Sequence, residues 1–303
     1  MQNQFQPGVV LQEMRAASGD SSRYHVCLID EMNIARVEHY FAEVLSAIED
    51  RTPAKEGGFE SSPIVTQDLP DDPERWTGQV LPGNLGIVGT VNMDESTHGF
   101  SRKVLDRAFT IELSEIELAT NLTAKAENDV ASHEIEFWPR DYWNCKSSRL
   151  AELDSASHES KIREIVDTLV QFNASLQVSQ LQVGYRTRDE IILFVLNAAD
   201  IGDSFKTSSG EVVDPLDLAL MMKVLPRIAG GNNSIRRTLL GLLGIATSGT
   251  PLSHSEEPSE LLENWESEGR PSTLDGARFP RTASRLCMMW DRLDTEGFTS
   301  FWL

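Results

Sequence analysis

The chain has 303 residues, of which 40% are hydrophobic and 24% charged, the composition of an ordinary globular protein with room for one or two domains. Its 47 acidic and 27 basic side chains give a formal net charge of −20. Because nucleic-acid binding depends on Lys and Arg neutralising phosphates, this charge argues against non-specific DNA or RNA binding by this chain alone.

Several chemistries are set aside by motifs that the sequence lacks. The cysteines, Cys27, Cys145 and Cys287, are widely spaced and form no Cys-x-x-Cys pair, which predicts a reducing, cytoplasmic location and no cysteine metal site. No His-Glu-x-x-His or Gly-x-Ser-x-Gly motif is present, so we expect neither zinc nor serine hydrolase chemistry. No apolar run approaches the ~18 residues of a membrane helix, and we expect no membrane partner.

The first stretch that carries chemistry follows a short helix predicted at residues 7–17. Residues 26–29 are apolar, which indicates a buried parallel strand, and this strand ends at Asp30 and Glu31. In open α/β sheets, ligands bind beyond the carboxyl ends of the strands. One acid at such an end can hold magnesium, while the next polarises an attacking water. The alternative is a strand that simply runs out into a charged loop.

A helix, a connector and a second strand follow. Apolar residues recur with helical spacing over residues 34–48, which predicts one amphipathic helix directly after the acids. Residues 52–83 are rich in Pro, Gly, Asp and Ser, which is typical of a solvent-exposed connector. Residues 85–91 are another buried-strand pattern that ends at Asn92, with Asp94 beyond it.

The remainder of the chain predicts helices more than strands. Residues 109–113 indicate a third short strand, and residues 158–245 indicate a bundle of four amphipathic helices. The polar stretch 247–276, rich in Ser, Pro, Gly and Glu, predicts a flexible linker. Residues 278–296 predict a final amphipathic helix, whose apolar tail we expect to dock on the bundle or on a neighbouring subunit.

Five stretches together resemble one family. Asp-Glu-Met-Asn-Ile-Ala-Arg-Val-Glu-His-Tyr-Phe at residues 30–41 is the first, and Gly-Thr-Val-Asn-Met-Asp-Glu-Ser-Thr-His-Gly-Phe-Ser-Arg-Lys-Val-Leu-Asp-Arg-Ala at residues 89–108 is the second. They are similar to the AAA+ family of the motor subunit in McrBC-type, methylcytosine-specific restriction systems. The similarity continues through residues 184–190, 223–227 and 297–302, so it covers nearly the whole chain.

The resemblance implies an α/β fold class: a partial AAA+ P-loop NTPase core, a parallel sheet with helices, followed by an α-helical lid domain. The core would occupy residues 1–117 and the lid residues 158–246. Residues 118–157 would be a linker or insertion, residues 247–276 a flexible linker, and residues 277–303 a C-terminal helix with an apolar tail.

The resemblance also implies roles for four residues of the core. Asp30 would hold a magnesium ion, and Glu31 would be the catalytic base. Asn92 matches the sensor-1 position, where a polar side chain orients the attacking water beside Glu31; a strand-end asparagine that caps the next turn is the alternative. Asp94 would serve the same nucleotide site or cap the helix that follows.

Arginines complete the implied site. Arg107 matches the arginine finger, a planar and permanently charged group that stabilises charge developing on the γ-phosphate held by the neighbouring subunit. Arg102 is the second choice, and a surface salt bridge is the alternative for either residue. Arg188 matches the sensor-2 arginine of the lid, with Arg186 as its substitute; a plain arginine at the start of a helix is the alternative reading.

The family is a nucleoside triphosphatase, so the resemblance implies hydrolysis of ATP or GTP with Mg²⁺. It implies a homo-oligomeric ring, expected to be a hexamer, with a nuclease partner subunit and indirect contact with DNA. The alternative is a catalytically incomplete interaction protein, a scaffold or a gene remnant. It arises because no lysine follows a glycine anywhere, so the phosphate-binding Gly-x-x-x-x-Gly-Lys-Ser/Thr loop is absent. In the family this loop precedes the first acidic strand, and we expect a fragment or a truncated gene model that begins after it.

The missing loop generates a direct prediction. Purified as given, the chain is expected to show no measurable ATP or GTP hydrolysis, because backbone N–H groups and the loop lysine supply most of the affinity for the phosphates. Phosphate release and equilibrium nucleotide binding test this, and micromolar binding of either nucleotide would contradict it.

Overall fold

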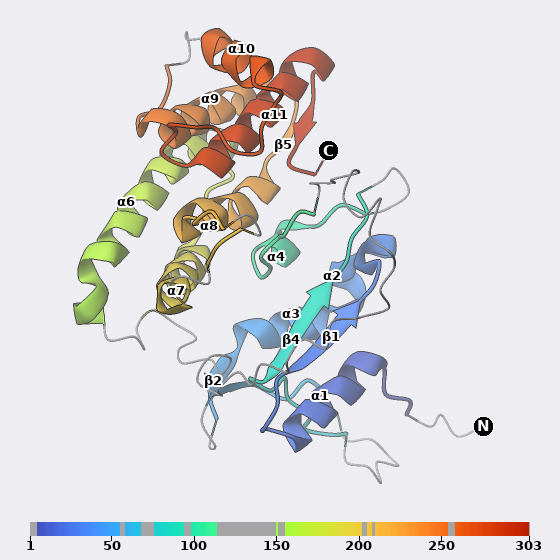
Figure 1. The fold of residues 1–303 in the computed structure, drawn as a ribbon. Helices are drawn as coiled ribbons and strands as arrows, with labels where there is room; N and C mark the ends of the chain where they lie inside the picture. Colours follow the sequence, from blue (N-terminus) through green and yellow to red (C-terminus); the bar gives the residue numbers. More distant parts are fainter. Residues whose placement is uncertain are drawn as a thin grey trace, which may run out of the picture. The chain divides into compact units, whose positions relative to one another are not determined.

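The computed structural model describes residues 5–54, 58–67, 76–93, 98–113, 150, 155–201, 205–207, 210–253 and 258–302. The fold is mixed α/β and divides into two compact units (Figure 1). The α/β unit comprises Met1–Met32, Phe41–Val91 and Ile111–Ser148; the helical unit comprises Asn33–Tyr40, Asn92–Thr110 and Arg149–Leu303. Among the described helices, none combines the length and the apolar character needed to cross a bilayer.

The α/β unit is built around two parallel strands, as the sequence predicted, but the prediction that these strands are buried is wrong for most of their residues. β1 (His25–Ile29) pairs with β4 (Leu85–Gly89), with His25 opposite Leu85 and Ile29 opposite Gly89 (Figure 1). Side chains alternate between the two faces, so Cys27 is buried while Val26 and Leu28 are exposed. The unit's other elements are α1 (Val9–Gly19), α3 (Ala42–Glu49) and the antiparallel pair of β2 (Arg51–Pro53) and β3 (Phe59–Ser61).

Asn84 joins α1 to the start of this sheet. Its buried amide nitrogen lies 2.9 Å from the carbonyl oxygen of Ala17 and 3.0 Å from those of Asp20 and Arg23. The backbone carbonyl of Asn84 accepts the first hydrogen bond of the β1–β4 ladder, from the His25 N–H at 2.8 Å. The Asn84 side chain thus holds the end of α1 and the turn after it, while the Asn84 backbone carbonyl bonds the start of β1.

The single helix predicted for residues 34–48 is wrong. The chain instead forms a 3₁₀ turn, η1 (Met32–Ile34), a short helix, α2 (Val37–Tyr40), and α3. Phe41 separates α2 from α3, because its φ of −114° and ψ of 14° lie outside the helical region. Val37 and Phe41 are both buried, so the apolar spacing continues across the break and cannot reveal it.

The strand predicted for residues 109–113 is also wrong, since none of these residues is in a strand. The Thr110 N–H donates to the carbonyl of Met222 at 3.1 Å instead of to a neighbouring strand. Ile111 and Leu113 are 75% and 92% exposed. The alternation of apolar and polar residues resembles a strand, but a strand exists only where another strand completes its ladder.

The helical unit contains the bundle that the sequence predicted. Its main helices pack around one apolar core in which Phe172, Trp265 and Phe301 are fully buried (Figure 1). The elements are α4 (Arg102–Leu105), η3 (Ser155–His158), α6 (Glu159–Leu176), η4 (Gln177–Ser179), α7 (Tyr185–Ile201), α8 (Pro215–Lys223), η6 (Leu225–Arg227), β5 (Ala229–Gly230), α9 (Asn233–Ser248), α10 (Ser259–Ser267), α11 (Pro280–Glu296) and β6 (Thr299–Ser300).

Residues 247–276 differ from the predicted flexible linker because they contain α10. Trp265 anchors this helix: its indole N–H lies 3.2 Å from both the Pro271 carbonyl and the Ser284 hydroxyl. Most residues of α10 are polar, and Trp265 is the residue of this helix that is buried. The predicted docking of the C-terminal tail is confirmed, since β6 pairs antiparallel with β5 and Trp302 donates to the Pro226 carbonyl at 3.2 Å.

Two aspartates fix helix starts in this unit. Asp214 caps α8, as predicted from Asp-Pro, by accepting the Leu216 N–H at 2.9 Å. Asp217, on α8, accepts the N–H groups of Arg281 and Thr282 in the first turn of α11, each at 2.9 Å. Burial raises the pKa of the Asp217 carboxyl, and these hydrogen bonds oppose the rise. Asp217 therefore joins two helices of the core by satisfying the unpaired N–H groups of one of them.

We expect Asp217→Ala to lower the free energy of unfolding by about 2–3 kcal/mol, because it leaves two buried N–H groups without an acceptor. The matched change Asp214→Ala removes a local cap and should cost about 1 kcal/mol. Urea denaturation followed by tryptophan fluorescence measures both, since Trp265 and Trp290 are buried in this unit. A smaller loss for Asp217→Ala than for Asp214→Ala would contradict the prediction.

Candidate nucleotide-hydrolysis residues

The carboxyl ends of β1 and β4 place Asp30 beside Thr90. The Thr90 hydroxyl donates to Asp30 Oδ1 at 2.5 Å and accepts the N–H of Glu31 at 2.9 Å. The peptide groups extend the pairing, since the Thr90 N–H donates to Ile29 and the Met32 N–H donates to Thr90. Both acids are exposed. The predicted position of Asp30 and Glu31 at a strand end is confirmed, and Thr90 is a partner that sequence reasoning missed.

Glu31 has a left-handed backbone, with φ of 50°. This conformation costs a residue other than glycine about 1–2 kcal/mol, and such residues gather at functional sites. The other described non-glycine residues with positive φ, Gln180 and Arg270, follow helices, where left-handed residues are common. Glu31 instead follows a strand, and the bond from its N–H to Thr90 holds it there.

Asn92 is held through its backbone in the helical unit. The side chain of Asn33, only 1% exposed, donates to the Asn92 carbonyl at 2.9 Å, while the Asn33 carbonyl accepts the N–H of His98 at 3.0 Å. The Asn92 side chain is exposed. Glu31 belongs to the α/β unit and Asn92 to the helical unit, so their cooperation stays a prediction. Asp94 lies outside the described residues.

Arg107 lies just after α4 and is half-buried, with its guanidinium donating to the carbonyl of Lys103. Arg102, the second choice for the finger, donates to the carbonyl of Gln180 at 3.2 Å. Arg102 therefore has a structural contact that joins α4 to η4. Both arginines therefore donate to a backbone carbonyl, and the choice between them stays a prediction.

Lys223 is the most buried charge among the described residues, with 1% of its surface exposed. Its ammonium lies 2.5 Å from Glu190 Oε2, 3.0 Å from the Asp106 carbonyl and 2.9 Å from the Ala108 carbonyl. The two contacts with carbonyls are hydrogen bonds, and the contact with Glu190 is an ion pair. Burial lowers the pKa of Lys223 and raises the pKa of Glu190, while their mutual attraction opposes both shifts.

Arg227 extends this buried cluster. Its side chain is 5% exposed and lies 2.5 Å from Asp106 Oδ1, and it also donates to the Thr187 hydroxyl at 2.8 Å. Asp106 is therefore held by its side chain through Arg227 and by its carbonyl through Lys223. Residues 223–227 are one of the stretches that resemble the family, but a Lys-x-x-x-Arg pattern does not reveal burial and so predicts no role for them.

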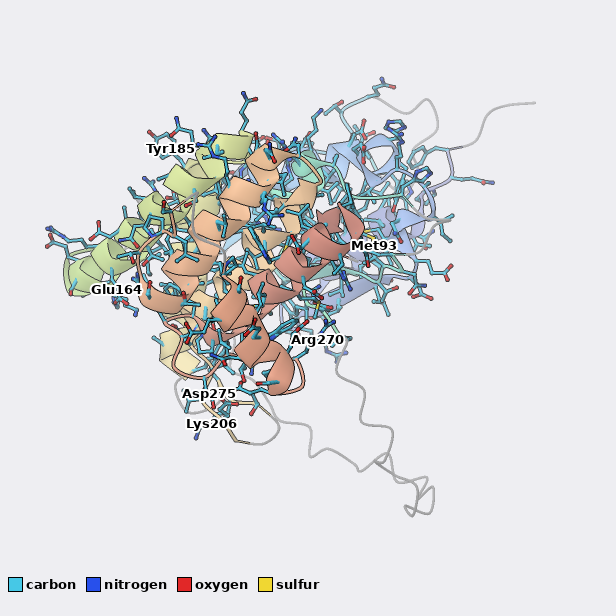
Figure 2. The ribbon with its side chains drawn as sticks, turned by 90° about the horizontal axis from the view of Figure 1, so that it is seen from above. Met93, Glu164, Tyr185, Lys206, Arg270 and Asp275 are labelled. Carbon is cyan, nitrogen blue, oxygen red and sulfur yellow. The ribbon has the colours of Figure 1, made fainter. Side chains whose placement is uncertain are left out.

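Arg188 lies in the first turn of α7, where a positive charge is unfavourable to the helix dipole. Asp189 offsets this charge, with its Oδ1 2.6 Å from Arg188 Nη2. The guanidinium also lies 5.0 Å from the ring centre of Tyr185, whose exposed ring is at the outside of the unit (Figure 2). Arg186 is exposed on the same turn. The two sensor-2 candidates are thus neighbours at one helix end.

The comparison with protein families gives one match. Residues 134–298, more than half of the chain, match a family described as a domain of unknown function (DUF8727). The matched region includes α6 to α11, and with them Glu190, Lys223 and Arg227. The strands β1 and β4 lie outside it. No curated protein and no solved structure matches the chain.

The backbone of Glu31 generates a prediction about stability. Glu31→Gly should raise the stability of the α/β unit by about 1 kcal/mol, because glycine adopts a left-handed conformation without a penalty. Glu31→Ala retains the penalty and serves as the matched control. Hydrogen exchange of the β1 amides measures the local stability of each variant. Equal protection in the two variants would show that the fold does not strain this position.

Proposed function

The chain belongs to the family described as a domain of unknown function (DUF8727), and for it we propose the function of an AAA+ ring subunit that hydrolyses ATP or GTP in a restriction or defence system. In this proposal the chain is a partial P-loop NTPase core followed by a helical lid, related to the motor subunits of McrBC-type systems. The observation that carries the proposal is the contact of Asp30 with Thr90 at the carboxyl ends of two parallel strands.

That contact supports a nucleotide site for two reasons. First, ligands of open α/β sheets bind where the carboxyl ends of the strands meet. Second, the chain keeps Glu31 in a left-handed conformation directly after Asp30, and backbone strain of this kind is typical of functional positions.

The residues fit a magnesium ion bound with its nucleotide. Mg²⁺ is usually held by one or two carboxylates together with substrate phosphates and waters, so a lone exposed Asp30 oriented by a hydroxyl is a suitable donor. The ion would neutralise charge on the phosphates. Within the described residues, no three acidic, His or Cys side chains gather as a metal site.

The other residues would act on the attacking water and the γ-phosphate. Glu31 accepts a proton from the water, and Asn92 orients that water. Arg107 stabilises charge on the γ-phosphate held by a neighbouring copy, and Arg188 or Arg186 contacts the phosphates from the lid. These 303 residues contain no phosphate-binding loop, so the proposal requires that other residues cradle the phosphates.

The proposed assembly is a homo-oligomeric ring, a hexamer, with a nuclease partner subunit. A finger that acts on a neighbouring copy requires such an assembly. The net charge of −20 supports contact with DNA through another subunit rather than through this chain.

A second candidate function is an interaction or scaffold protein without turnover. The missing phosphate-binding loop favours it, as does the extensive apolar core of the helical unit, which is independent of any nucleotide. In that case the site residues would preserve the family geometry without catalysis.

Glu31→Gln separates the two candidates. The tagged chain, purified from its source cells with its bound partners, should hydrolyse ATP or GTP, and Glu31→Gln should lower kcat by about 100-fold or more because the base is lost. Glu43→Gln, a change of an exposed glutamate on α3, is the matched control and should leave kcat unchanged.

An intact assembly without hydrolysis would favour the scaffold. Equal turnover in the wild type and Glu31→Gln would contradict the proposed base.

A further inference from the structure

The segment that carries Arg107 is fastened to the helical bundle at several points. Arg102 donates to the Gln180 carbonyl at its start, and the Thr110 N–H donates to the Met222 carbonyl at its end. Between them, the ring of Phe109 stacks on Phe194 with centres 5.2 Å apart. This segment therefore belongs to the same compact unit as the bundle.

Lys223 contacts the chain on both sides of Arg107. Its ammonium donates to the carbonyl of Asp106, the residue before Arg107, and to the carbonyl of Ala108, the residue after it. The same ammonium lies 4.8 Å from the ring centre of Phe109. One buried ammonium thus fixes the direction of the carbonyls of the residues before and after Arg107, which restricts the backbone rotations that aim the Arg107 side chain.

The cost of this arrangement suggests a purpose beyond stability. A buried ion pair contributes little or nothing to stability compared with well-packed apolar residues of similar volume, because both charges lose their hydration. The Lys223 side chain is fully buried in this pair, and Glu190 is 27% exposed. Apolar residues could not donate hydrogen bonds to the carbonyls of Asp106 and Ala108, which lie on either side of Arg107.

We propose that Lys223 is a positioning residue, which holds the backbone around Arg107 so that the helical unit presents this arginine to the nucleotide site of a neighbouring copy. The inference rests on the proposed function, because it takes Arg107 as the arginine finger. It assigns residues 223–227 a role: Lys223 holds the carbonyls on both sides of the finger, and Arg227 holds the side chain of Asp106.

The contacts of Lys223 couple movement of α8 to the position of Arg107. Arg107 is carried by the helical unit, whereas Asp30 and Glu31 are carried by the α/β unit of the same chain. A displacement of α8 would reach Arg107 directly through Lys223. The state of one subunit's helical unit would therefore set how well its finger serves the next subunit.

The test uses a charge-neutral pair of changes. Lys223→Met alone would leave Glu190 buried without its partner and could unfold the chain. Lys223→Met combined with Glu190→Gln removes both charges and keeps similar volumes, so the fold should survive while the two carbonyls lose their donor. Glu190→Gln alone keeps the Lys223 nitrogen, which remains a donor to both carbonyls as an ammonium or as a neutral amine, and is the matched control.

The first measurement does not depend on nucleotide. In the purified 303-residue chain, hydrogen exchange of the peptide covering residues 101–110 should be at least about tenfold faster in the double variant than in Glu190→Gln. Exchange of the α9 amides, far along the chain from this segment, should be unchanged. Equal exchange of residues 101–110 in the two variants would overturn the positioning role, whatever the function of the protein.

The second measurement uses the assembly purified from source cells. Arg107→Ala should lower kcat by on the order of 1,000-fold, and the double variant should also lower kcat while leaving KM unchanged, since an arginine finger acts in the transition state. Adding Arg107→Ala to the double variant should cause no further loss. Additive losses would mean that Lys223 does not act through Arg107.

Mixed assemblies then separate positioning from general damage. Subunits with Glu31→Gln lack the base but retain the finger, so mixing them with the double variant should restore part of the turnover, as should mixing them with Arg107→Ala. Mixing the double variant with Arg107→Ala should restore none. Faster exchange in an assembly without hydrolysis would refute the proposed function but leave the contact of Lys223 with this segment established.

Discussion

The contacts of the buried Lys223 ammonium join α7 and α8 to the segment that carries Arg107. The ammonium compensates Glu190 on α7 and uses its other two donors on the carbonyls of Asp106 and Ala108. A segment that contains only the four-residue helix α4 could not hold its shape alone, because so short a helix is unstable in water. The bundle supplies what the segment lacks, and Arg107 gains a defined position from it.

The α/β unit holds Asp30 and Glu31 in a different way. Asn84 aligns α1 with the start of the sheet, and Thr90 joins the ends of β1 and β4 by bonding both Asp30 and the Glu31 backbone. Between these two points, β1 and β4 pair over only five residues each. The unit thus places two acids by local hydrogen bonds, whereas the helical unit places its arginine by burial of charge.

Sequence patterns predicted the features that depend on local chemistry. The apolar run before Asp30, the Asp214 cap and the stripes of α6 and α9 all follow from side chains near in sequence. The break at Phe41, the lost strand at residues 109–113 and the helix α10 depend on distant partners, which no local pattern reveals. For the same reason the sequence predicted Asp30 as a candidate site residue. The contacts of Thr90, Asn33 and Lys223 join residues far apart in the chain, so they could be identified only in the folded structure.

The most direct test of the account is the structure of the assembly purified from source cells with Mg²⁺ and a non-hydrolysable ATP or GTP analogue. We expect an Asp30 oxygen at about 2.1 Å from the magnesium ion or one water away, with Arg107 of the adjacent copy at the γ-phosphate. An assembly without nucleotide, or with nucleotide bound away from the ends of β1 and β4, would contradict the central claim.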